Sequence, residues 1–171
     1  MSLSASSIVK PVVQQYLSSL SHLVDKAQSF SAEKGLDEQV LLQTRLAPDM
    51  HPFIWQVQMI SEFCARCVAR MAELELPNVP FEETTYDQLK QRIEDMQTFV
   101  ANVDDELIDA AMEKEQTVQL GPDRSVTFKG PVYLNHFFLP NLFFHITTAY
   151  NILRSNGLDI GKFDYIGQMP S

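Results

Sequence analysis

Four long stretches of this sequence place apolar residues at the three- and four-residue spacing of an amphipathic helix. They cover about residues 7–34, 52–75, 85–100 and 131–156. Each such helix carries one apolar stripe, which an isolated helix would leave in water. Four helices bury their stripes by packing against one another. The sequence therefore predicts an all-α protein built as a four-helix bundle.

Turn and capping residues mark the ends of these helices independently of the apolar stripes. Gly35 provides a stop for the first long helix, and Asp37 is placed to cap a short helix that ends near Leu42. Thr85 and Gln88 have the spacing of a capping box at the start of the third long helix. The connections between the first and second long helices, and between the third and fourth, are long, which argues against a minimal bundle.

The connection before the last long helix has a different pattern. Short alternating runs flank the turn sequence Gly121–Arg124 and predict a small β-hairpin inserted there. A short helical stretch is expected before it, at about residues 104–112. Pro140 lies inside the last long helix and should kink or split it, because proline lacks an N–H donor and its ring clashes with the preceding turn.

Length and charge narrow the range of functions. A chain of 171 residues suits a single domain, residues 1–171, with a full hydrophobic core. The net charge of −9, from 13 Lys and Arg against 22 Asp and Glu, disfavours nucleic acids and anionic membrane surfaces as partners. No apolar run approaches the ~20 residues of a membrane span, and the first residues lack the features of a signal peptide. We expect a cytoplasmic protein.

Cysteine and histidine are the residues with the most versatile chemistry. Cys64 and Cys67 have the CxxC spacing, but both fall mid-helix on the apolar stripe of the second long helix, so we interpret them as buried core residues. The four histidines do not form an HxxxH or HExxH metal-binding pair. They are His22, His51, His136 and His145. Among them, His145 is predicted on the inward face of its helix.

A polar cluster is predicted around His145. Asn141 lies one helical turn earlier and projects toward nearly the same patch. Gln56 lies at the inward edge of the second long helix, so the three side chains can meet if the two helices are neighbours. Two interpretations stay open at this point. The cluster is a hydrogen-bonded network inside the core, or it lines a site for a ligand or metal.

The run Phe137–Phe144 is apolar on every side of its helix. A helix of this kind is central in its own domain or is half covered by another subunit. The run therefore predicts a homodimer built partly on the last long helix.

Several segments of the chain resemble the DUF1993 family, and together they cover nearly the whole chain. The segments that carry the resemblance are Leu139–Gly157, Gly161–Gly167, Arg45–Met50 followed by Gln56–Gln58, and Glu83–Thr85 with the helix after it. The resemblance implies a bacterial family of unknown function within the DinB/YfiT-like helical-bundle superfamily. It agrees with the fold predicted from the apolar stripes.

Characterised members of that superfamily are metal-dependent thiol transferases and isomerases, whose metal is held by three histidines. The resemblance carries these ligand positions onto Gln56, Asn141 and His145, with His51 close to the first of them. Only one of the three is a histidine, and neutral amides are weak ligands for zinc or nickel. We therefore expect a degenerate metal site without a tightly bound metal or other cofactor.

Three functions follow as hypotheses. The first is a small-ligand-binding protein in which Gln56, Asn141 and His145 supply hydrogen bonds. The second is a thiol transferase or isomerase with an altered zinc or nickel shell, in which His145 is a ligand, helped by His51 or by the two amides, and a bound water is the base or nucleophile. The third is a dimeric structural or interaction protein.

Overall fold

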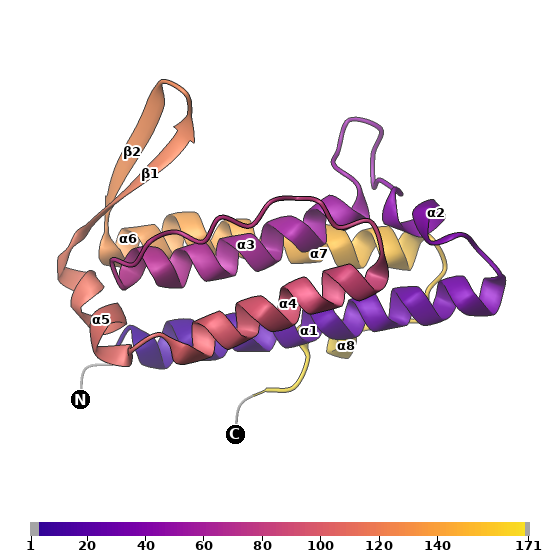
Figure 1. Ribbon diagram of the computed structural model, residues 1–171, viewed down its shortest axis with the longest axis horizontal. Helices are drawn as coiled ribbons and strands as arrows, with labels where there is room; N and C mark the ends of the chain where they lie inside the picture. The colour runs from indigo at the N-terminus through magenta and orange to yellow at the C-terminus, as the bar shows by residue number, and fades with distance from the viewer. Residues whose placement is uncertain (1–3, 170–171) are drawn as a thin grey trace.

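Four long helices lie side by side in the computed structural model, which describes residues 4–169 (Figure 1). They are α1 (Ser6–Lys34), α3 (Phe53–Met71), α4 (Tyr86–Asn102) and α7 (Leu139–Ser155). Helix α3 packs against both α7 and α4, and α1 packs against α4, α3 and α7. The predicted helical bundle is confirmed. None of the helices within residues 4–169 combines the length and the apolar character needed to cross a membrane.

The ends of the helices follow the predicted capping residues. Gly35 ends α1 in the left-handed conformation, at a φ of 62°, which glycine adopts without steric cost. The Asp37 side chain accepts from the N–H of Gln39 at the start of α2 (Glu38–Leu42). Thr85 and Gln88 form the complete capping box of α4.

The core between the helices is continuous and contains both cysteines. Cys64 and Cys67 are fully buried, and their interpretation as core residues is confirmed. Burial raises the pKa of both thiols, so they stay uncharged at neutral pH. The two side chains therefore act as small apolar residues in the packing of α3.

The predicted hairpin projects from one end of the bundle (Figure 1). It follows α5 (Asp105–Ala110) and the short 3₁₀ turn η1 (Ala111–Glu113). Its strands β1 (Glu115–Gly121) and β2 (Arg124–Lys129) pair antiparallel, with an irregularity near the turn. The hairpin runs directly into α6 (Gly130–Tyr133), so it is covalently tied to the start of the last helical segment.

The last helical segment is irregular near Pro140, as expected, and its three parts follow one another without a loop. Between α6 and α7 the chain makes a π-helical turn, η2 (Leu134–Phe138), in which the N–H of Leu139 donates to the carbonyl of Leu134. Pro140 follows at the first turn of α7, where its missing N–H is tolerated. The wider π turn changes which side chains face the core around it.

The tail after α7 packs against α1 and contains the short helix α8 (Lys162–Ile166). The hydroxyl of Ser19 donates to the carbonyls of Asp164 and Tyr165, and His22 lies 2.8 Å from Asp164. His22 is thus paired with a carboxylate of the tail. The last two residues of the chain, 170–171, lie outside the described residues.

Candidate functional site

A hydrogen bond between α3 and α7 joins two of the residues predicted to form a polar cluster. His145 Nδ1 lies 2.9 Å from Gln56 Oε1. The Gln56 amide nitrogen donates to the carbonyl of His51 at 3.1 Å, which turns the amide oxygen toward His145. Because an amide oxygen only accepts, His145 must donate from Nδ1 and carry its free lone pair on Nε2. The pair therefore holds His145 in one tautomer.

Aromatic rings surround this pair. Trp55 stacks on His51, with ring centroids 3.9 Å apart, and meets His145 edge-on at 5.5 Å. Phe144 and Phe63 also lie beside the His145 ring. Burial among these rings, together with the nearby His51, lowers the pKa of His145 to about 4. His145 is therefore neutral at physiological pH.

Asn141 lies outside the Gln56–His145 pair. Its side-chain nitrogen donates to the carbonyl of Phe137 on its own helix at 2.6 Å. Within residues 4–169 no hydrogen bond joins Asn141 to either member of the pair. The Asn141 side chain bonds the carbonyl one helical turn earlier instead of the predicted cluster, as Asn156 also does at the end of α7.

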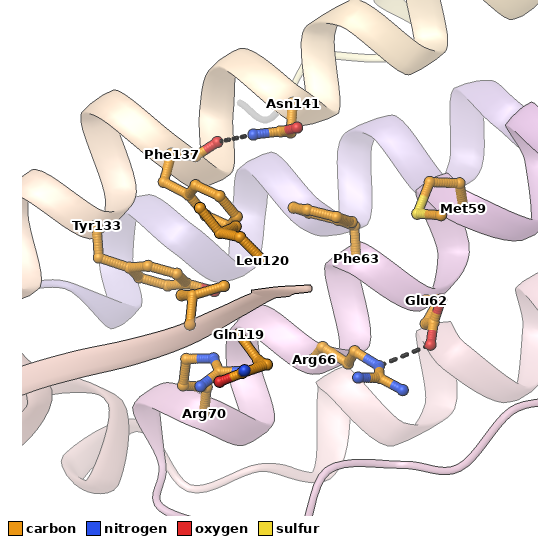
Figure 2. Close-up of a pocket in the computed structure, with 11 residues that line it drawn as sticks. Met59, Glu62, Phe63, Arg66, Arg70, Gln119, Leu120, Tyr133, Phe137 and Asn141 are labelled. Atoms are coloured by element: carbon orange, nitrogen blue, oxygen red, sulfur yellow. Dashed lines mark hydrogen bonds and ion pairs between the residues drawn. The ribbon is translucent and has the colours of Figure 1, made fainter. Parts of the chain in front are cut away.

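A cavity of about 380 Å³ lies beside this region, between α3, the hairpin and the segment α6–α7 (Figure 2). Its apolar wall consists of aromatic and aliphatic side chains from all three. They are Met59, Phe63, Val118, Leu120, Tyr133 and Phe137. Asn141 and Phe63 both line the cavity, and the Phe63 ring centroid lies 6.3 Å from that of His145. Of the three predicted site residues, only Asn141 lines this cavity.

The charged part of the cavity wall comes from one face of α3, and Gln119 of β1 and Asn141 add uncharged polar groups. Glu62, Arg66 and Arg70 follow one another at four-residue intervals and all line the cavity. Arg66 Nε lies 2.7 Å from Glu62 Oε1, and Arg70 Nη1 donates to the carbonyl of Thr117 on β1. Arg70 thus links the hairpin to the bundle beside the cavity.

These charged residues could have been found from the sequence, because their spacing places them on one helical face. They are not among the predicted site residues, and a charged face of a helix usually faces solvent. The contribution of the hairpin, through Val118 and Leu120, has no signal in the sequence. It depends on where the hairpin packs.

The residues present do not fit a three-histidine metal shell. Gln56 and Asn141 occupy two of the three implied positions, and the side-chain nitrogen of each is used in a hydrogen bond to a backbone carbonyl. Across the described part of the chain, no three His, Cys, Asp or Glu side chains form a group that could hold a metal ion. That the protein binds no metal tightly stays a prediction.

Comparisons with known proteins support the fold and name no activity. A family model described as "Domain of unknown function (DUF1993)" matches residues 6–166. The chain is similar to a solved structure of a DinB family member protein from Shewanella denitrificans, with 34% sequence identity and a TM-score of 0.84. That match covers 93% of this chain and 89% of the other. No curated protein matches the chain.

Proposed function

Since the chain belongs to the DUF1993 family, whose description names no function, we propose that it binds a small organic molecule in the cavity between α3, the hairpin and the segment α6–α7. The cavity is the observation that carries this proposal. Its volume of about 380 Å³ falls within the range of roughly 300–1,000 Å³ that is typical of small-molecule sites. Such sites combine a mostly apolar wall with a few polar groups.

The wall of the cavity has this composition. Phe63 from α3 and Phe137 from the π turn approach to 5.8 Å between ring centroids, and Tyr133 stacks with Phe137 at the same distance. These rings offer flat surfaces against which a ligand ring or chain can pack. Asn141 and the charged residues of α3 supply the polar contacts.

The π turn supports a functional role for this wall. π-helical turns are rare, and they are frequently found at functional sites. Here the turn Leu134–Phe138 contains Phe137 and begins directly after Tyr133, so it sets how these two cavity-lining residues lie relative to each other. A regular helix through Pro140 would present these positions differently.

We assign the Gln56–His145 pair a positioning role. It connects α3 to α7, and neither member lines the cavity, although the His145 ring lies 6.3 Å from that of the cavity-lining Phe63. A histidine with a pKa of about 4 is a weak general base near neutral pH, so the site favours binding over catalysis by His145. The likeness to a DinB family member supports the fold, and a shared fold does not by itself indicate a reaction.

A fragment screen by saturation-transfer NMR tests this proposal. The variant Leu120→Trp fills the cavity from the hairpin, and Leu107→Trp on α5 is its matched control, because the two leucines are 43% and 44% exposed and only Leu120 lines the cavity. We expect aromatic fragments to bind the wild type and Leu107→Trp and to lose their signal with Leu120→Trp. Absence of binding to the wild type, or equal binding to both variants, would overturn the proposal.

A further inference from the structure

The charged wall of the cavity carries an excess of positive charge. Arg66 and Arg70 contribute two positive charges to the lining, and Glu62 contributes one negative charge. This local excess stands in a chain whose net charge is −9. An acidic protein that collects arginines at this cavity has a local preference for anions there.

The guanidinium of Arg66 is incompletely satisfied. Its Nε is buried and lies 2.7 Å from Glu62 Oε1, yet it makes no hydrogen bond of good geometry with any described residue. The two observations agree if the contact is an ion pair whose N–H does not point at the carboxylate. Buried polar groups in native proteins nearly always have a hydrogen-bond partner, so this N–H indicates a missing acceptor.

The spacing of the two arginines points the same way. Arg66 and Arg70 are four residues apart on α3, where like charges repel each other. Glu62 offsets only one of the two charges, and the Thr117 carbonyl that Arg70 contacts is uncharged. An anionic group between the two guanidinium groups would remove the repulsion and accept from both.

We propose that the ligand of this cavity is a small organic monoanion, with a carboxylate held by Arg66 and Arg70 and an apolar or aromatic body packed against Phe63, Tyr133 and Phe137. One negative charge matches the one uncompensated positive charge of the lining. Tyr133 and Phe137 come from the segment α6–η2, opposite the helix α3 that carries Phe63 and the two arginines (Figure 2). This inference rests on the proposed function and names the chemical class of its ligand.

A matched pair of probes tests the charge directly. We expect 3-phenylpropanoate to bind the wild-type protein at least 10-fold more tightly than its neutral amide, 3-phenylpropanamide, in NMR titrations at low salt. Added salt should weaken the binding of 3-phenylpropanoate and leave the binding of the amide unchanged. Equal affinity for the acid and the amide would overturn this inference and leave the proposed function standing. Binding of neither compound, together with an empty fragment screen, would overturn both.

Arginine variants then locate the anion site. Arg66→Gln and Arg70→Gln should each weaken binding of the acid at least fivefold while the affinity for the amide is kept, which shows that the cavity is still folded. Arg124→Gln on β2 is the control, since it removes one positive charge outside the cavity lining. An equal loss with Arg124→Gln would mean a general charge effect and would contradict a site at Arg66 and Arg70.

Discussion

The buried guanidinium of Arg92 joins α4 to α3 and to the extended segment that connects them. Arg92 donates to the hydroxyl of Ser61 at 2.7 Å, to the carbonyl of Pro80 at 2.8 Å and to Glu83 at 2.8 Å. Burial favours the protonated form of Glu83, but hydrogen bonds from Arg92 and Gln58 outweigh burial and keep its pKa below the usual value. The segment before α4 is therefore held along the bundle by one charged network (Figure 1).

Replacement of Arg92 should destabilise the fold. We expect Arg92→Met to lower the free energy of unfolding by about 3–5 kcal/mol, because it leaves the largely buried Glu83 without its partner. Urea denaturation measures the loss, with the exposed Arg124→Met as control. A loss below about 1 kcal/mol would show that water or another cation replaces Arg92.

The pH dependence of stability reports on His145. Its pKa is about 4 in the folded protein and close to 6.5 when unfolded. As the pH falls, the unfolded chain therefore protonates His145 before the folded protein does. The contribution of neutral His145 to the free energy of unfolding is complete above pH 6.5. It is lost as the pH falls toward 4, by at most about 1.4 kcal/mol per pH unit. We expect the stability difference between the wild type and His145→Ala, measured by urea denaturation, to shrink over this range. A difference that stays constant would contradict the lowered pKa.

At the scale of elements, the junction between the hairpin and α6 packs closely against the backbone of η1. A Cβ on Gly130 would lie 2.5 Å from the carbonyl oxygen of Ala111 and 2.8 Å from the Cα of Met112. Both atoms belong to the backbone and cannot turn aside as a flexible side chain would. Glycine here therefore allows the hairpin to return onto η1 before the last helical segment begins.

We expect Gly130→Ala to lower the unfolding free energy by about 1–3 kcal/mol, because backbone atoms must shift to admit the methyl group. Gly161→Ala is the control, since a Cβ there meets no atom within 4 Å, and its effect should stay within about 0.5 kcal/mol. Thermal denaturation of the two variants gives the comparison. Equal stability would indicate that η1 moves away at little cost.

At the scale of the whole molecule, the apolar run on the last helix is only partly buried. Phe138 and Leu142 are fully buried, whereas Phe143 is 37% exposed and Phe144 is 57% exposed. Part of the run thus faces outward from the bundle. This outward part is the surface on which the predicted homodimer would form.

We expect sedimentation velocity to show a dimer for the wild type and a monomer for Phe144→Asp, because a charge at this position would be buried without a partner in the interface. Leu107→Asp on α5 is the control and should stay dimeric. A wild-type mass that remains monomeric at all concentrations would rule the homodimer out.

The candidate site was only partly predictable from residue spacing. Gln56 and His145 do meet. To predict this contact, it is enough to know the helical period, which places both residues inward, and that α3 and α7 are neighbours. Asn141 was predicted beside them, and its side chain instead bonds the carbonyl of Phe137. A helical asparagine can bond the carbonyl one turn earlier or a neighbouring helix, and helical spacing does not decide between the two.

The sequence by itself determined the four helices, their caps, the hairpin and the buried cysteines, because these follow from local periodicity and from residues close together in the chain. Only the tertiary structure decided the cavity. It joins Arg66 and Arg70 of α3 to Leu120 of the hairpin and Phe137 of the π turn, which lie far apart in sequence. Packing of whole helices and strands brings such residues together. The spacing of residues within one element does not show where another element packs.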